Sequence, residues 1–181
     1  MLVTTDDEIV SSLAALSELR YEGRRVSFVG PDAKNIRVDL RVKEPHQLVS
    51  LARSVAYLGH EEANFRGAHL WITTWGVWNP QVEAIGRKTL EQFRRGQGEN
   101  RPLELAPGHI FRDDEFTEAV CCLLQPMIVG WDAYYIPRWE FGNLDYLVAV
   151  SHDSFLDIKV RTQAMHERAL RSLGSHAWTE G

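Results

Sequence analysis

The stretch Gln125–Val160 constrains the fold more than any other part of the chain. Aromatic and β-branched residues, which favour strands, alternate there with tight-turn residues, and two ionisable neighbours, His152 and Asp153, interrupt the pattern. Three strands are expected, the last of which is open to a second assignment as part of the terminal helix: Met127–Ile136, Leu144–Ser151 and Phe155–Val160. The segment therefore predicts a C-terminal β-meander.

Hydrophobic periodicity predicts the other elements. Ile36, Val38, Leu40 and Val42 alternate with charged residues, as in a strand with one dry face and one wet face. Thr5-Asp6-Asp7-Glu8 matches a capping box and opens a helix that should fade near residues 21–23. The remaining expected elements are a strand at 26–29, a helix at 45–58, a strand at 68–75, a helix at 80–96, a helix from Asp113 or Asp114 to Pro126, and a terminal helix at 162–173.

The order of these elements does not alternate regularly between strand and helix, so a doubly wound parallel sheet is not expected. We predict an α+β fold with a mixed or mainly antiparallel sheet of about five to six strands covered by helices, in which the C-terminal β-meander is followed by a terminal helix. A length of 181 residues suits one ordinary core. We therefore expect a single globular domain over residues 1–181.

Composition narrows the classes of protein that remain. No apolar run approaches the roughly 20 residues that cross a membrane, and the N-terminus lacks the basic start and apolar core of a secretion signal. The two cysteines, Cys121 and Cys122, are adjacent rather than spaced for a disulfide framework. A net charge of −5 with scattered Lys and Arg argues against nucleic acid. We expect a soluble, cytoplasmic protein with neither a membrane nor a nucleic-acid partner.

His152 and Asp153 are the first candidates for chemistry, because an imidazole beside a carboxylate can act as a base or a metal ligand. Neighbours on an extended chain point to opposite faces, however, and Asp153 is equally well explained as a turn residue. A catalytic site would require Asp132 or Glu140 to converge with His152 in one concave site. No metal-ligand spacing, phosphate loop or nucleophile motif is present, so no cofactor is expected.

Six tryptophans are many for a chain of this length, and some of them are hard to bury. Aromatic and Arg side chains anchor protein interfaces, so the partner-binding candidates are Trp78, Tyr135, Arg138 and Trp139. The favoured hypothesis is a small protein-interaction module without catalytic activity; immunity and antitoxin proteins are examples of such acidic domains without motifs. The alternative is a hydrolase or metal-assisted enzyme that uses His152, Asp153 and Asp132.

Overall fold

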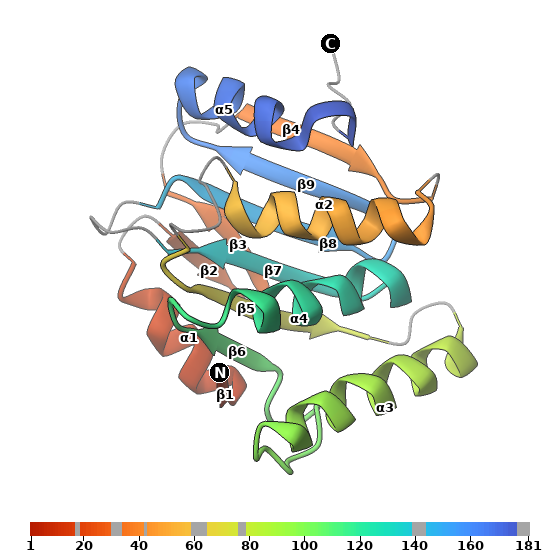
Figure 1. Cartoon of the computed structure of the whole chain (residues 1–181). Coiled ribbons are helices and arrows are strands. Elements are labelled where there is room, and N and C mark those ends of the chain that lie inside the picture. The colour runs from red at the N-terminus through yellow and green to blue at the C-terminus, as the bar shows by residue number, and fades with distance from the viewer. Residues whose placement is uncertain are drawn as a thin grey trace.

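The computed structural model describes residues 1–16, 19–29, 34–41, 43–58, 65–75, 79–138 and 144–176. Its centre is a seven-stranded antiparallel sheet with the strand order β1-β6-β5-β7-β8-β9-β4 (Figure 1). The strands of this sheet are β1 (Leu2–Thr4), β4 (Lys34–Asp39), β5 (Ala68–Thr74), β6 (Gly108–Phe111), β7 (Asp132–Pro137), β8 (Tyr146–Ser151) and β9 (Phe155–Val160). A separate hairpin consists of β2 (Leu19–Glu22) and β3 (Arg25–Phe28). The predicted α+β class is confirmed.

Helices cover one face of the sheet, which we call the helix face. Three of them, α2 (Pro45–Tyr57), α4 (Phe116–Val129) and α5 (Gln163–Leu173), lie across it, as predicted (Figure 1). In the part of the chain that the structure describes, the opposite face, called the outer face, is covered in part, by α1 (Asp6–Ala14) and the β2–β3 hairpin. The remaining helix, α3 (Pro80–Gly96), packs against α4.

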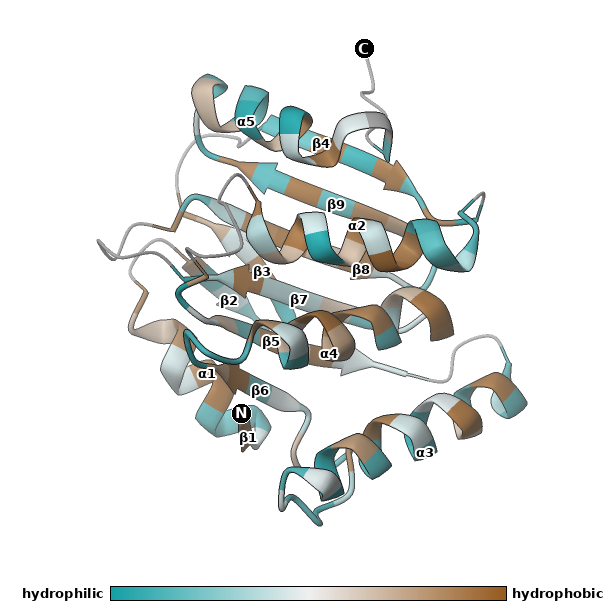
Figure 2. Ribbon diagram, viewed as in Figure 1, coloured by the Kyte–Doolittle hydropathy of each residue, from teal (hydrophilic) through white to brown (hydrophobic). Residues whose placement is uncertain are grey.

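The alternation of side chains along each strand divides the core into two clusters. In β8, Tyr146, Val148 and Val150 are buried on the helix face, while Leu147 is buried on the outer face beneath α1 and the hairpin. Hydrophobic and hydrophilic residues alternate along β9 and β4, which the hairpin does not cover (Figure 2). The half of the outer face formed by these two strands is therefore polar.

The N-terminal helix begins as predicted but ends earlier. Thr5 and Glu8 form the expected capping box, whereas α1 stops at Ala14. Residues 19–22, which were expected to lie at the fading end of the helix, form β2 instead. Pairing with β3 buries Leu19 and Val26 against the outer face, and this tertiary burial outweighs local helix preference.

The fourth helix differs from the prediction at both ends. Glu115, rather than Asp113 or Asp114, is its N-cap residue. Pro126 lies inside the helix instead of closing it, so residues 127–129 are helical and β7 starts only at Asp132. The helix ends at Gly130, whose φ of 76° suits a residue without a Cβ, and the Gly130 and Trp131 N–H groups both donate to the Pro126 carbonyl.

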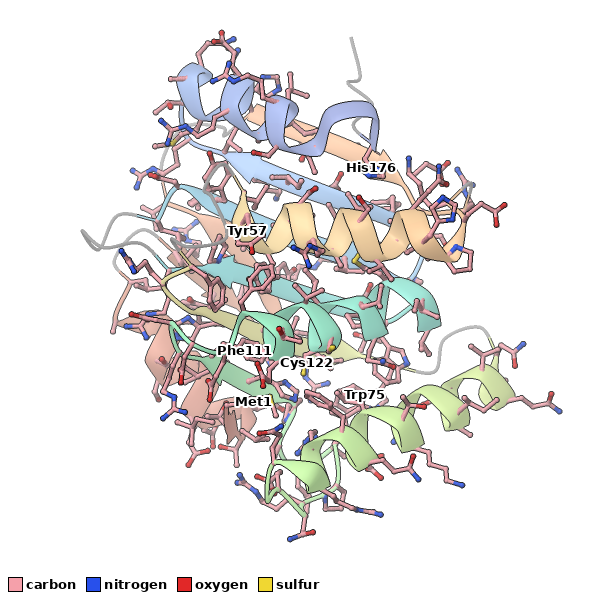
Figure 3. All side chains as sticks on the ribbon, in the orientation of Figure 1. Met1, Tyr57, Trp75, Phe111, Cys122 and His176 are labelled. Atoms are coloured by element: carbon pink, nitrogen blue, oxygen red, sulfur yellow. The ribbon has the colours of Figure 1, made fainter. Side chains whose placement is uncertain are left out.

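The third helix approaches α4 closely at Gly86. A Cβ added there would lie 2.5 Å from Cγ2 of Val129, so only glycine permits this distance between the helices. Beneath α4, the free thiol of Cys122 is buried with its Sγ 3.8 Å from Met1 Sδ (Figure 3). Cys122 therefore serves as a packing residue.

Candidate functional site

Two of the residues predicted as candidates for chemistry meet where β7 begins and β8 ends. Nδ1 of His152 lies 2.9 Å from each carboxylate oxygen of Asp132, and the His152 backbone N–H donates to Oδ1 at 2.9 Å. Both side chains are a little under one-third exposed. Because a carboxylate only accepts hydrogen bonds, a neutral His152 carries its proton on Nδ1 and has its acceptor at Nε2. Asp132 thus orients the imidazole.

The third candidate, Asp153, stands on the other side of the same ring. Its Oδ1 lies 3.7 Å from His152 Nε2, and its side chain is 58% exposed. Residues His152–Ser154 and the last turn of α4, residues 127–130, line a hollow of about 360 Å³, which we call the turn hollow. The structure therefore places an imidazole between two carboxylates beside a concave surface.

The β8–β9 turn that carries His152 is locally strained. Ser154 has a φ of 63°, in the left-handed region that non-glycine residues seldom adopt. The Ser154 N–H donates to the Ser151 carbonyl at 3.0 Å, and the Asp153 N–H donates to Ser151 Oγ at 3.2 Å. The Ser151 hydroxyl thus acts as a turn acceptor, which agrees with the turn expected at residues 152–154.

Replacement of Ser154 by glycine is expected to stabilise the protein by about 0.5–1 kcal/mol, because glycine adopts a positive φ without the steric cost of a Cβ. Urea unfolding followed by circular dichroism measures the change. Ser27→Gly, in β3 where φ is negative, is the matched control and should destabilise by a similar amount. A loss of stability in Ser154→Gly equal to that in the control would contradict this explanation.

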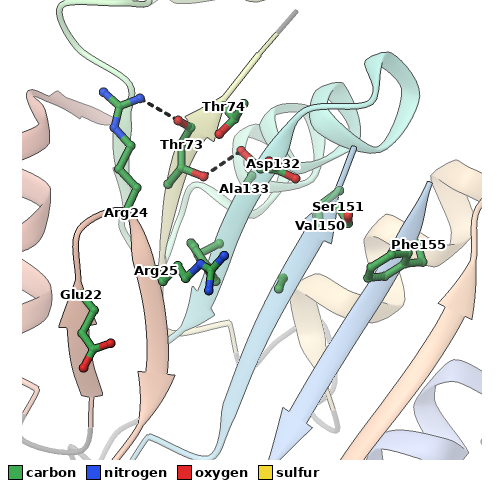
Figure 4. A pocket seen from close by; sticks show the side chains of 12 residues that line it. Glu22, Arg24, Arg25, Thr73, Thr74, Asp132, Ala133, Val150, Ser151 and Phe155 are labelled. Carbon is green, nitrogen blue, oxygen red and sulfur yellow. Dashed lines mark hydrogen bonds between the residues drawn. The ribbon is translucent and has the colours of Figure 1, made fainter. Parts of the chain in front are cut away.

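A second concave surface lies between the β2–β3 hairpin and the sheet, and we call it the hairpin groove (Figure 4). It has a volume of about 470 Å³. Arg24 fixes the hairpin, since its Nη1 donates to the Thr73 carbonyl at 2.7 Å and its Nη2 donates to Asp6 at 3.1 Å. The lining residues come from the hairpin and from four sheet strands: Glu22, Arg24, Arg25, Thr73, Thr74, Asp132, Ala133, Tyr134, Ala149, Val150, Ser151 and Phe155.

The floor of the hairpin groove combines aromatic and small residues. Tyr134 and Ala149 are directly opposite each other on β7 and β8, and Phe155 pairs with Ser151 on the next strand. All of these side chains are partly exposed, and the short Ala149 leaves space between the two rings. Asp132 lines the hairpin groove and binds His152, which lines the turn hollow, so this pair of residues links the two concave surfaces.

The two predicted partner-binding residues that the structure describes, Tyr135 and Arg138, do not form one surface. Tyr135 is fully buried on the helix face, with its hydroxyl 3.4 Å from the Ala56 carbonyl, and this burial raises its pKa above the usual range. Its prediction as a surface residue was wrong, because strand alternation exposes Tyr134 instead. Arg138 is exposed, but it lies at the opposite end of β7 from Asp132. Trp78 and Trp139, like Glu140, lie outside the described residues.

Four groove residues were not predicted from the sequence as site residues: Arg24, Arg25, Tyr134 and Phe155. Arg24 and Arg25 were not recognised because the residues before them were expected to be helical, so no hairpin was predicted there. A signal was present, since Gly23, whose φ is 60°, separates two short segments of strand-forming residues. Tyr134 and Phe155 lay in predicted strands, but sequence did not show that the hairpin would leave their face open.

Comparison of the chain with protein-family models, with curated proteins and with solved structures gave no match. Within the described ranges, no three or more His, Cys, Asp or Glu residues are grouped so as to hold a metal ion. In the same part of the chain, no helix has the length and apolar character needed to cross a membrane. The molecule is thus an α+β protein with two concave surfaces that the hydrogen-bonded Asp132–His152 pair links.

Proposed function

We propose that the protein is a small cytoplasmic interaction module that binds another protein through the hairpin groove and performs no reaction of its own. One observation carries this proposal: the hairpin covers only half of the outer face and leaves Tyr134, Ala149 and Phe155 partly exposed beside Arg24 and Arg25. Aromatic and Arg side chains are the residue types that dominate binding energy at protein interfaces. The space over Ala149 can receive an anchoring side chain of the partner.

The charges around the groove fit a protein partner better than a nucleic acid. The exposed residues Glu22 and Arg25 are directly opposite each other in the hairpin, so the rim presents both signs within a short distance. A phosphate backbone requires a surface of one positive sign, and the chain as a whole carries a net charge of −5. An acidic domain of the immunity or antitoxin kind agrees with this balance.

Site-specific photocrosslinking in the cell that encodes the protein tests this proposal. A photoreactive residue at position 155, on the groove floor, is expected to give one discrete adduct with a partner protein. Arg25→Glu should weaken that adduct, because it places a second negative charge opposite Glu22 on the rim. The control places the photoreactive residue at Lys88, which is exposed on α3. The proposal fails if position 155 gives no adduct, or if position 88 gives the same adduct.

A second function, acid–base catalysis at the turn hollow, is favoured by the Asp132–His152 pair. A carboxylate that holds Nδ1 of an imidazole, 2.9 Å away, prepares Nε2 to take a proton from a hydroxyl group or a water molecule. The Ser151 hydroxyl accepts from the Asp153 N–H and so stabilises the turn, and we assign it no role as a nucleophile. The reaction that fits this arrangement is hydrolysis by an activated water.

If this second function holds, His152→Gln is expected to lower the rate of hydrolysis by about 100-fold or more, because the proton acceptor is removed. Asp132→Asn should also lower the rate, since an amide does not orient the ring as a carboxylate does. A panel of ester, amide and phosphoester substrates provides the assay. His46→Gln, at an exposed position on α2, is the control. Equal rates in wild type and His152→Gln would remove the catalytic candidate and leave the binding proposal intact.

A further inference from the structure

The sheet has two edges, and β4 forms the longer one. The strand at the other edge, β1, has three residues, whereas β4 has six, Lys34–Asp39. Within the described part of the chain, β4 pairs with β9 alone. An edge strand presents a row of backbone N–H and C=O groups to which another strand can bind.

The direction of these backbone groups follows from one hydrogen bond. The Leu40 N–H donates to the Ser154 carbonyl at 2.9 Å, which continues the β4–β9 ladder beyond Asp39. In antiparallel pairing, successive residues turn their backbone groups alternately toward and away from the neighbouring strand. Because residue 40 faces β9, the N–H and C=O groups of Asn35, Arg37 and Asp39 point away from the sheet.

Side chains that could block this edge are folded back onto the molecule. Lys34 Nζ donates to Gln163 on α5, and Asn35 donates to Asp157 on β9 at 3.2 Å. Arg37 binds both carboxylate oxygens of Asp157, at 2.8 and 2.9 Å. The pairing with β9 is continuous over the six residues, and the strand contains no proline. β4 thus has no bulge and no proline, and its charged side chains are held within the chain, Lys34 by Gln163, Arg37 by Asp157 and Asp39 by Arg41 at 2.6 Å.

We propose that β4 pairs in antiparallel fashion with β4 of a second copy of this chain, about a two-fold axis at Val38. This register brings Arg37 of each copy opposite Asp39 of the other, and Val38 opposite Val38. Centring the pair on Arg37 would place two arginines opposite each other, and centring it on Asp39 would place two aspartates opposite each other. A register centred on Ile36 pairs Arg37 with Asn35 and gains no opposite charge. Charge complementarity therefore selects the axis at Val38.

A contact of one strand per copy buries little surface, so the dimer should form reversibly and only at high protein concentration. The two seven-stranded sheets would join into one continuous sheet. The hairpin lies over the part of the sheet around Trp71 and Leu147, whereas Phe155 of the groove is directly opposite Asp39 on β4, so the joined edge of the dimer would run beside the groove. This inference does not depend on the proposed binding function.

Sedimentation velocity over a series of concentrations tests the dimer. The wild type should shift from monomer to dimer as its concentration rises. Asp39→Arg and Arg37→Asp should each be monomeric alone, because each places like charges opposite one another. An equimolar mixture of the two variants should dimerise again, because each introduced charge then meets its opposite. Asp114→Arg is the control, since Asp114 has a 77% exposed side chain away from β4, and it should dimerise like the wild type.

A backbone variant keeps the inference testable if Arg37→Asp, which loses its bond to Asp157, does not fold. Asp39→Pro removes one outward N–H group and leaves the ladder with β9 intact, because proline is tolerated at an edge when its N–H would face solvent. Asp39→Pro should melt like a folded protein and remain monomeric. A wild type that stays monomeric at every concentration, or Asp39 variants that dimerise as it does, would overturn the proposal.

Discussion

Acidification from pH 7 to pH 4 is expected to destabilise the folded protein by several kcal/mol, because two buried histidines bind protons only after unfolding. Burial, reinforced by the charge of Arg138, lowers the pKa of His69 to about 4. Burial, together with the charge of Arg94, lowers the pKa of His109 to about 3. In the unfolded chain both groups titrate near pH 6.5.

The direction of this pH dependence follows from the number of protons that the two histidines bind in the folded and in the unfolded state. Above about pH 6.5 both histidines are neutral in either state, so they contribute no pH dependence. Below that pH the unfolded chain binds protons that the folded protein does not, and stability falls by about 1.4 kcal/mol per pH unit for each histidine. Since a typical domain is stable by roughly 5–15 kcal/mol, acid unfolding is expected well above pH 2.

Urea unfolding at a series of pH values measures this slope directly. His109→Gln and His69→Gln should each reduce it by about 1.4 kcal/mol per pH unit, whatever their effect on stability at pH 7. Val49→Ala, an exposed substitution on α2 that removes no titratable group, is the control and should keep the wild-type slope. The explanation fails if His109→Gln retains the full wild-type slope.

Truncation of Trp131 to alanine is expected to lower the free energy of unfolding by about 3–5 kcal/mol, the largest loss we anticipate from a single substitution. The indole is fully buried in the helix-face core, and a Cβ added at Gly86 would lie 3.3 Å from its Cζ2 atom. Its removal would open a large cavity where α3 and α4 meet. Chemical denaturation followed by circular dichroism gives the change in unfolding free energy.

Two substitutions bracket this expectation. Trp131→Phe should lose much less than Trp131→Ala, because the phenyl ring fills most of the site and the indole N–H has no hydrogen-bond partner in the described part of the chain. Ile85→Ala removes an apolar side chain that is 68% exposed and should change stability by less than about 0.5 kcal/mol. Comparable losses in Ile85→Ala and Trp131→Ala would show that burial does not set the cost.

Elements with a strong local signal were predictable from the sequence. The capping box at Thr5, the proline that opens α2 at Pro45 and the Asn79 cap of α3 all act within one helical turn. The alternation that predicted β4 likewise reflects one buried face. The segment Phe155–Val160, whose assignment to a strand or to the terminal helix was left open, forms β9. In these segments local preference and tertiary burial agree.

The missed elements depend on distant partners. The strands β1 and β6 have three and four residues, too few to show the alternation of apolar and polar residues that marks a strand. They form because they pair with each other. The extension of α4 past Pro126 reflects the burial of Met127 in the core. Proline signals a helix end locally, whereas the free energy of burial decided the outcome here.

The candidate site could be predicted only in part for the same reason. Asp132 and His152 were recognisable as candidates, but their contact depends on the register of β7 with β8, which aligns the two strand ends. The hairpin groove was not predictable, because it arises where β2 and β3 dock on a sheet built from later parts of the chain.

Pairing between distant segments also governs how the chain folds during its synthesis. Arg37 contacts Asp157 across 120 residues, and β5 completes its pairing only when β7 has been made. At typical translation rates the ribosome needs roughly ten seconds to add 120 residues. During that interval the early strands lack their partners and expose apolar surface. We therefore expect the nascent chain to depend on chaperones until the C-terminal meander has been synthesised and its strands can pair with β4 and β5.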